Sequence, residues 1–378
     1  MTQSFEGKTI TCRAAVAWEA AKPLTIEEIQ VEPPRAGEVR VKVTHSSICH
    51  SDAYTLSGKD YAYRFPMILG HETSGIVESV GEGVTKVKPG DRVIPLYMAE
   101  CGMCPLCLSG KTNLCGALLK TQAMGIMPDG SSRFSCRGET IYHFMGISGF
   151  SEYTVLSQFS VSKVDDDAPL DKVCLIGCCI PTGYGAATRI ANVKKGSSCA
   201  IFGCGALGLS VIQGAKAAGA GKIIAVDINS AKFDQAKHFG ATHCVNPLET
   251  PDVKIEQVLK ELTDGGLDYT FDTSGGNIEV MKSALEALNN DDSTCVIISL
   301  ADAGNVLSTN TTSLVGRKLT GCAFGGVKGS ELNDYVKLYK EDKLLIDEYI
   351  TKNINIDEIN DGFDDLKHGR SVREVIFM

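Results

Sequence analysis

Four cysteines stand close together in CGMCPLCLSGKTNLC, a 15-residue stretch of this 378-residue chain. They are Cys101, Cys104, Cys107 and Cys115. This spacing is too close for ordinary core positions but suits a single metal ion, because four thiolates close a tetrahedral zinc shell. A closed shell leaves no place for a substrate, so we expect this zinc site to stabilise the fold rather than to carry chemistry.

A second set of metal-binding side chains is spread along the chain. Cys49 lies in SSICHSDAYTLSG, His71 in GHE and Cys178 in CLIGCCIPTGYG. Two thiolates and one imidazole form a three-ligand site whose fourth position is open to water or substrate, the pattern of catalytic zinc. Each residue alone is more often structural, but their combination with the four-cysteine loop and a nucleotide motif favours the catalytic interpretation.

The nucleotide motif is the glycine turn GCGALG, with Gly203, Gly205 and Gly208. It follows a strand candidate and opens a helix candidate, the context that aims a helix N-terminus at a pyrophosphate. Asp227 ends the next strand candidate, where a carboxylate accepts hydrogen bonds from the adenosine ribose and repels a 2′-phosphate. Lys232 lies one helical turn further on. We therefore expect NAD rather than NADP.

Two kinds of scaffold must position these residues. The first half is rich in Gly, Pro and short runs such as VRVKVTHSS and DRVIPLY, which predict an irregular β domain. From about residue 194, apolar strands alternate with helix-compatible stretches, which predicts a parallel, doubly wound α/β domain. The closing segment indicates a helix and a strand that return to the first domain. The strand candidates are 197–203, 222–228, 242–247, 267–275 and 293–301.

Composition restricts the partners of the chain. Its length and 43% hydrophobic content favour two domains. A net charge of −9 disfavours nucleic acid and anionic membranes, which attract basic faces. The N-terminus has no signal pattern and no apolar run approaches the roughly 20 residues that span a bilayer, so we expect a cytoplasmic protein. Fifteen cysteines in such a chain predict reduced thiols.

The whole chain resembles the medium-chain, zinc-dependent alcohol dehydrogenases. Within that family it is most similar to class III, the glutathione-dependent formaldehyde dehydrogenases, through strings such as CHSDAYTLSG, GHETSGIVESVGEGV and MPDGSSRF. The resemblance implies a GroES-like catalytic domain with both zinc ions (1–181), a Rossmann NAD-binding domain (182–324) and a return to the catalytic domain (325–378). It also implies a homodimer joined at the edge of the Rossmann sheets, near SLVGRKLTGCAFGG.

The resemblance assigns a role to each residue around the catalytic zinc. Cys49, His71 and Cys178 are the expected ligands. Glu72 lies behind the metal, and Asp52 orients His71 by accepting its other ring N–H. The zinc ion lowers the pKa of a bound alcohol, and the alkoxide carbon then gives hydride to NAD.

Four further residues receive roles in substrate or coenzyme binding from the same resemblance. Ser51 is expected to hydrogen-bond the alcohol. His50 is expected to contact the coenzyme phosphate and to pass the proton on towards solvent. A role in phosphate binding alone is an equally good interpretation. Arg373 matches the pyrophosphate-binding arginine, a use that suits a forked, permanent cation. Thr182 is expected to pack near the nicotinamide.

Substrate-binding positions depart from the class III pattern. That pattern holds the two carboxylates of S-hydroxymethylglutathione with basic residues, but Leu119 and Asn290 stand at two of those positions. Asp60 is retained, but the position two residues later, which is usually acidic in the family, is Ala62 here. Arg64 is a candidate to replace a missing basic contact with the substrate. One lost charge-assisted contact costs about 1.5–3 kcal/mol. The expected substrate is therefore this thiol adduct or a longer, less anionic alcohol or aldehyde.

Two other functions stay open at this point. One is a lyase or isomerase that keeps zinc and NAD without net redox turnover. The other is a non-catalytic, NAD-responsive binding protein, which is disfavoured because nothing in the metal shell is missing. The expected cofactors are two Zn²⁺ per chain and NAD, and the expected ligand is a small molecule.

Overall fold

The chain folds into two compact units, shown in a computed structural model that describes residues 5–60 and 62–378. Residues up to Cys178 form the first unit together with Lys328–Met378, and Cys179–Val327 form the second. The sequence places the corresponding boundaries after residues 181 and 324.

The first unit is mainly β structure with short helices. Its strands are β1 (Ile10–Ala17), β2 (Thr25–Val31), β3 (Glu38–Ser47), β4 (Met67–Ile68), β5 (Glu72–Val80), β6 (Arg92–Pro95), β7 (Phe134–Cys136), β8 (Glu139–His143), β9 (Tyr153–Ser157), β10 (Val161–Lys163), β17 (Ile350–Asn355) and β18 (Arg373–Phe377). Its helices are α1 (His50–Leu56), α2 (Pro105–Leu108), α3 (Leu119–Ala123), α4 (Leu170–Val173), α10 (Leu332–Lys340) and α11 (Ile359–Lys367).

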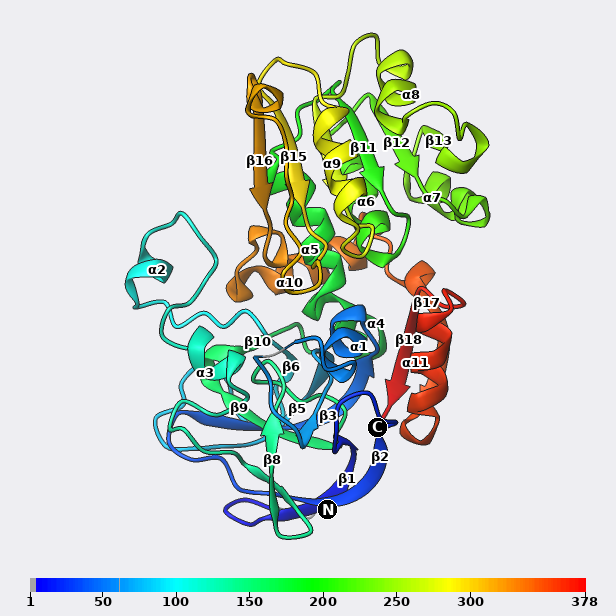
Figure 1. The fold of residues 1–378 in the computed structure, drawn as a ribbon. Helices are drawn as coiled ribbons and strands as arrows, with labels where there is room; N and C mark the ends of the chain where they lie inside the picture. The colour runs from blue at the N-terminus through cyan, green and yellow to red at the C-terminus, as the bar shows by residue number, and fades with distance from the viewer. Residues whose placement is uncertain (1–4, 61) are drawn as a thin grey trace. The chain divides into compact units, whose positions relative to one another are not determined.

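Two β systems organise this unit (Figure 1). One is a closed barrel in the order β1-β2-β7-β8-β4, and the other is a seven-stranded sheet in the order β10-β6-β5-β3-β18-β17, with β9 beside β3. Strand β1 shows why the sequence folds this way, because Ile10, Cys12 and Ala14 are buried while Thr11 and Arg13 are exposed. This alternation is the two-residue period of a strand with one face in the core.

The end of the chain completes the first unit. β18 pairs antiparallel with the second half of β3, with Val375 opposite Ser47, and parallel with β17. Helix α11 packs closely here, since a Cβ on Gly362 would lie 2.5 Å from the Ile48 side chain. The pairing brings the start of β18 beside the segment that leads into α1.

The second unit is a parallel sheet in the order β13-β12-β11-β14-β15-β16 (Figure 1). Its core contains apolar residues of strands and helices, such as Phe202, Ile224 and Leu285. This is the doubly wound arrangement that the alternating pattern predicts. Its strands are β11 (Ser198–Phe202), β12 (Lys222–Val226), β13 (His243–Val245), β14 (Tyr269–Asp272), β15 (Ser293–Ile297) and β16 (Arg317–Gly321). Its helices are α5 (Cys179–Gly185), α6 (Ala206–Ala217), α7 (Phe233–Phe239), α8 (Ile255–Leu262) and α9 (Ile278–Glu286).

We compared the described helices with the length and composition that a membrane span requires. Within the described ranges, no single helix is both long and apolar enough for a span. The consecutive helical segments 170–177 and 179–190 meet the criteria of length and composition only when they are taken together. Most of their residues are buried, as is typical of core helices.

Candidate metal centre and nucleotide turn

Four side chains from distant parts of the sequence converge in the first unit. The ligand atoms of Cys49, His71, Glu72 and Cys178 all lie within 4.8 Å of one another. Cys49 is the N-cap of α1, His71 and Glu72 lead into β5, and Cys178 follows the short turn 174–177. All four residues are buried. The fold therefore brings the three expected ligands together, with Glu72 beside them.

Asp52 ties two of these residues together. One of its carboxylate oxygens lies 3.2 Å from Nδ1 of His71 and accepts the Gly70 N–H, and the other accepts the Cys49 N–H at 3.1 Å. An Nδ1–H donated to a carboxylate leaves Nε2 as the lone-pair atom of the imidazole. Nε2 of His71 is buried and has no hydrogen-bond partner in the described parts of the chain. A metal ion among these thiolates supplies the partner that this nitrogen needs.

Arg373 approaches the centre from β18. Its guanidinium donates two hydrogen bonds of 2.9 Å to the two carboxylate oxygens of Glu72, and Nη2 also donates to Sγ of Cys49 at 3.4 Å. Only 3% of Arg373 is exposed, so this bidentate pair is buried. The pyrophosphate role of Arg373 stays a prediction, and the contacts within this unit give it a second task at the metal centre.

Neighbouring charges set the protonation of the centre. The thiol of Cys178, followed by the charges of Arg373 and His71, holds the pKa of Cys49 well below its usual range although burial opposes this. Burial also disfavours a charged His71, but Asp52 and Cys49 outweigh it and hold the pKa of His71 well above its usual range. These charges favour the thiolate of Cys49, the form of cysteine that binds a metal ion.

Aromatic rings form a wall beside His71. The ring centroids of Tyr97 and Phe144 lie 5.8 Å and 5.7 Å from that of His71, both edge-on. Tyr63 packs on the far part of this wall, with its centroid 5.0 Å from Phe144. Such a wall keeps water from the centre. Sequence reasoning missed these three residues, because single aromatic residues in unrelated segments form no pattern of spacing.

The other expected site residues of the first unit lie on α1, the following loop and α3. His50 and Ser51 begin α1, where His50 is exposed and Ser51 is partly buried. Asp60 accepts hydrogen bonds from the Thr55 hydroxyl and the Ala62 N–H. Leu119 is the first residue of α3 and is 40% exposed.

The four-cysteine loop forms a second metal-binding group in the first unit. The Sγ atoms of Cys101, Cys104, Cys107 and Cys115 lie within 4.8 Å of one another. Cys104 is the N-cap of α2, and its Sγ accepts the Cys107 N–H at 3.4 Å. That backbone hydrogen bond is the largest of the effects that lower the pKa of Cys104 to about 6. Burial instead raises the pKa values of Cys107 and Cys115, so it is the spacing of the four sulfurs that fits a closed zinc shell.

The glycine turn of the second unit has the shape of a phosphate cradle. Gly203 has φ +100°, and a Cβ on it would lie 2.6 Å from the Thr273 carbonyl oxygen. A Cβ on Gly208 would lie 1.9 Å from the Gly203 carbonyl oxygen, so close packing of α6 on the turn requires glycine. A Cβ on Gly205 would meet nothing within 4 Å, so the space over this residue is open to a phosphate. The turn and the N-terminus of α6 therefore fit the pyrophosphate of a dinucleotide.

Asp227 lies directly beside this turn. Its carboxylate accepts the Cys204 N–H at 2.7 Å and pairs with Lys232 at 3.1 Å. The acid that the sequence assigns to the adenosine ribose is thus fixed to the turn that would hold the phosphates. Thr182, the expected nicotinamide neighbour, is buried in α5 of the same unit.

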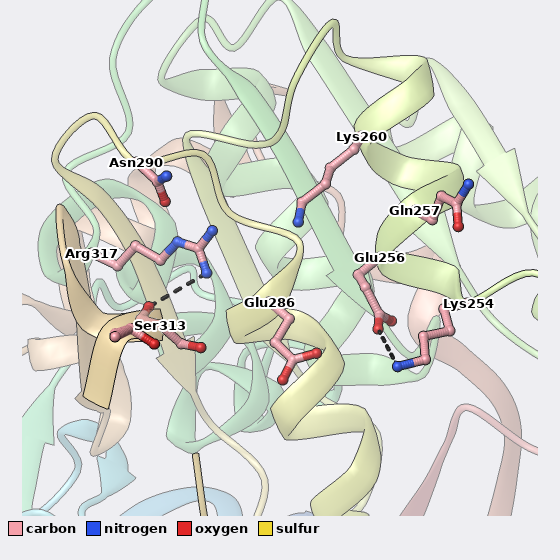
Figure 2. Close-up of a pocket in the computed structure, with 9 residues that line it drawn as sticks. Lys254, Glu256, Gln257, Lys260, Glu286, Asn290, Ser313 and Arg317 are labelled. Atoms are coloured by element: carbon pink, nitrogen blue, oxygen red, sulfur yellow. Dashed lines mark hydrogen bonds and ion pairs between the residues drawn. The ribbon is translucent and has the colours of Figure 1, made fainter. Parts of the chain in front are cut away.

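A cavity of about 540 Å³ in the second unit lies away from the glycine turn (Figure 2). It lies at the amino ends of β15 and β16, whereas parallel sheets bind nucleotides at the carboxyl ends of their strands. Arg317 donates to the Asn289 and Ser313 carbonyl oxygens, and Lys254 pairs with Glu256. These contacts satisfy several of its charges internally. The lining residues are Lys254, Glu256, Gln257, Lys260, Glu286, Asn290, Thr312, Ser313 and Arg317.

Comparisons with known proteins identify relatives over nearly the full chain. The family model of the alcohol dehydrogenase GroES-like domain matches residues 35–166, and that of the zinc-binding dehydrogenases matches residues 206–341. An alcohol dehydrogenase class-3 of Myxine glutinosa is 52% identical over 98% of this chain and 99% of that protein. An S-(hydroxymethyl)glutathione dehydrogenase of Komagataella pastoris is 52% identical over 99% of this chain and 100% of that protein.

A solved structure shares the same fold. The benzyl alcohol dehydrogenase of Acinetobacter calcoaceticus has a TM-score of 0.90 and 29% identity, with 98% of this chain and 99% of that chain covered. These matches confirm the expected fold class, a GroES-like domain with a Rossmann domain. Each of these relatives is named as a dehydrogenase, so the lyase or isomerase alternative receives no support.

Proposed function

The chain belongs to the zinc-dependent alcohol dehydrogenases of the class 3 type, and we propose that it oxidises S-(hydroxymethyl)glutathione with NAD as the hydride acceptor. The observation that carries the proposal is the buried Nε2 of His71, which has no described hydrogen-bond partner and lies among two thiols and a carboxylate. The 52% identity to a relative named for this substrate supports the choice of substrate.

In this proposal Cys49, His71 and Cys178 hold the catalytic zinc. A bound zinc ion supplies Lewis-acid polarisation of the substrate oxygen. Asp52 fixes the orientation of the imidazole, and Arg373, which pairs with Glu72, offsets the negative charge of Cys49. The Tyr97 and Phe144 rings exclude water, so the charges of the centre act at short range in a medium of low polarity.

Ser51 and His50 give the released proton a route to solvent. Ser51 is partly buried and His50, its neighbour on the first turn of α1, is exposed. The Ser51 hydroxyl accepts a hydrogen bond from the substrate hydroxyl, and His50 passes the proton on to water. This order from interior to surface supports proton transfer by His50 in addition to its phosphate contact.

The coenzyme is held by the glycine turn and its neighbours. Gly203, Gly205 and Gly208 take the pyrophosphate against the N-terminus of α6, and Asp227 with Lys232 takes the adenosine ribose. As the family resemblance implies, Arg373 and His50 would contact the phosphates, and Thr182 would pack by the nicotinamide. The four-cysteine loop holds the second, structural zinc ion.

We further propose a cytoplasmic homodimer. No disulfide joins any of the fifteen cysteines, all of which lie in the described ranges, and this fits a reducing compartment. Strand β16 is the outer strand of the second unit's sheet, where Leu319 is exposed, and Leu314 and Val315 are exposed in the segment just before it. An apolar edge needs a cover, which a second copy supplies. Light scattering at micromolar concentration should give twice the mass of the chain.

Nicotinamide absorbance tests the proposed reaction. With NAD, formaldehyde and glutathione together should give NADH, while omission of glutathione should remove most of the rate. A panel of glutathione-free primary alcohols serves as the comparison. Turnover of these alcohols with no rate on the adduct would overturn the proposed substrate, and no turnover of any alcohol or aldehyde would overturn the oxidoreductase assignment.

A further inference from the structure

Two exposed cations of the first unit, Arg64 and Lys120, lie on segments that contact the residues next to Phe144. Glutathione has a carboxylate at each end, so a site for its adduct requires positive charge on two sides of the reacting centre. We infer that Arg64 and Lys120 bind these two carboxylates. The inference rests on the proposed function and assigns residues to substrate recognition that the family resemblance does not.

Arg64 is anchored to the aromatic wall beside His71. Its neighbour Tyr63 packs on Phe144, with centroids 5.0 Å apart, and Phe144 lies 5.7 Å from the His71 ring. Two residues after Arg64, the Pro66 carbonyl oxygen accepts the Tyr142 N–H at 2.9 Å. The exposed Arg64 side chain thus starts one residue away from the wall of the metal centre.

Lys120 is anchored to the same wall through α3. The buried amide of Gln122 donates to the Met145 carbonyl oxygen at 3.1 Å. At the end of α3, the Gly125 carbonyl oxygen accepts the His143 N–H at 2.8 Å. These contacts hold α3 against the residues on either side of Phe144. The Lys120 side chain is exposed.

The Arg64 segment and the Lys120 segment contact opposite edges of the strand that leads into Phe144. Consecutive N–H groups of an extended strand point to opposite edges, and here Tyr142 bonds the Arg64 segment while His143 bonds the Lys120 segment. Chains on either side of one strand lie about 10 Å apart. An extended tripeptide also spans roughly 10 Å. The two backbones at Pro66 and Gly125 are therefore separated by about the length of an extended tripeptide, which is why we assign one end of the substrate to each segment.

Both cations are available for a ligand. Within the described ranges neither Arg64 nor Lys120 has an ion pair or a side-chain hydrogen bond. The Asp60 carboxylate in the Arg64 segment is occupied by the Thr55 hydroxyl and the Ala62 N–H. Arg373, which lies beside the metal centre, pairs with Glu72 and is assigned above to the coenzyme, so we do not assign it to a substrate carboxylate. Arg64 and Lys120 therefore offset the loss of a basic residue at Leu119.

Binding of S-methylglutathione, which is not a substrate for oxidation, tests the inference on enzyme loaded with zinc and NAD. We expect Arg64→Gln and Lys120→Gln each to raise Kd about tenfold in calorimetry, and the double variant to raise it about 100-fold, as for loss of contacts between charged groups. Arg64→Lys and Lys120→Arg should stay within about threefold of wild type. Lys367→Gln, an exposed lysine of α11, is the matched control and should leave Kd unchanged.

Kinetics separate this inference from the proposed function. The double variant should raise KM for the formaldehyde–glutathione adduct and leave KM for a long-chain neutral alcohol and the melting temperature unchanged. If wild-type enzyme turns over the adduct and the double variant matches it in Kd and KM, the inference alone fails. If wild-type enzyme oxidises neutral alcohols but neither binds S-methylglutathione nor turns over the adduct, the proposed function fails and the inference fails with it.

Discussion

The two cysteine centres of the first unit are built in opposite ways. The loop 101–115 contains all of its candidate ligands, and its sulfurs accept N–H groups of the loop itself. The centre at Cys49 combines segments as far along the chain as Cys178, and charged side chains support it. Its supports are Asp52, Glu72 and Arg373.

This contrast separates holding a metal from using it. A loop that supplies four sulfurs and their backbone donors needs little from the rest of the fold, so its metal can only stabilise. A centre with three ligands, a carboxylate–imidazole pair and a buried arginine has several groups that set the charge at the metal. Substitutions at the two centres should therefore have different consequences.

Substitution of His71 by Ala should have the largest effect on catalysis. Loss of a ligand removes the catalytic zinc, and Lewis-acid polarisation worth several kcal/mol goes with it, so kcat should fall at least about 1,000-fold. Metal analysis should find one zinc per chain instead of two. A variant that keeps two zinc ions and most of its activity would contradict the assignment of His71.

Substitution of Cys107 by Ser should show the opposite result at the loop. We expect loss of the other zinc ion and of more than about 3 kcal/mol of unfolding free energy, because metal binding here is folding energy. The melting temperature should fall, and limited proteolysis should cut between residues 101 and 118. The kcat of the enzyme that remains folded should stay within about twofold of wild type. A tenfold loss of kcat at unchanged stability would break the contrast.

Substitution of Asp52 by Asn tests the charged support of the open centre. The amide has the shape of the carboxylate but not its charge, so the imidazole becomes a weaker ligand. We expect about a 10- to 100-fold loss of zinc affinity, measured by competition with a chelator. The control is Asp60→Asn, which should leave zinc affinity unchanged. Equal losses in both variants would show that Asp52 has no specific role.

A second buried histidine, His143, should have a smaller effect, which is a pH dependence of the unfolding free energy. Burial, followed by the charge of Arg133, lowers the pKa of His143 to about 3, the opposite of the shift at His71, which has a carboxylate partner. His143 is therefore neutral in the folded chain, while the unfolded chain takes up a proton below about pH 6.5. Unfolding free energy should fall by about 1.4 kcal/mol per pH unit as pH decreases below that value.

Denaturant titrations at pH 7, 6 and 5 check this expectation. His143→Phe should remove that part of the acid dependence, because phenylalanine does not titrate. The same slope in wild type and variant would show that other groups cause it.

The sequence predicts most completely what is encoded locally. The cysteine spacing, the glycine turn and the strand–helix alternation each lie within short segments, so the four-cysteine cluster and the doubly wound sheet could be predicted. The ligands of the Cys49 cluster are far apart in the sequence, so their residue types indicate an open zinc site only in combination with the four-cysteine loop and the glycine turn, and the family resemblance supplies the individual roles. The pairing of Glu72 with Arg373 across 301 residues could not be predicted, nor could the packing of Tyr63 on Phe144. The catalytic and coenzyme roles of the individual residues stay predictions.

Strand β18 has a consequence for the order of folding during synthesis. It covers residues 373–377 and pairs with β3, which the ribosome makes more than 300 residues earlier. Until these residues are translated, half of one edge of β3 is unpaired and Arg373 is missing from Cys49. The second unit, which is continuous in sequence, can complete its sheet first. A nascent chain, or one ended by a stop codon near residue 370, would therefore expose thiols and a sheet edge together, which makes it a client for chaperones and a source of aggregates.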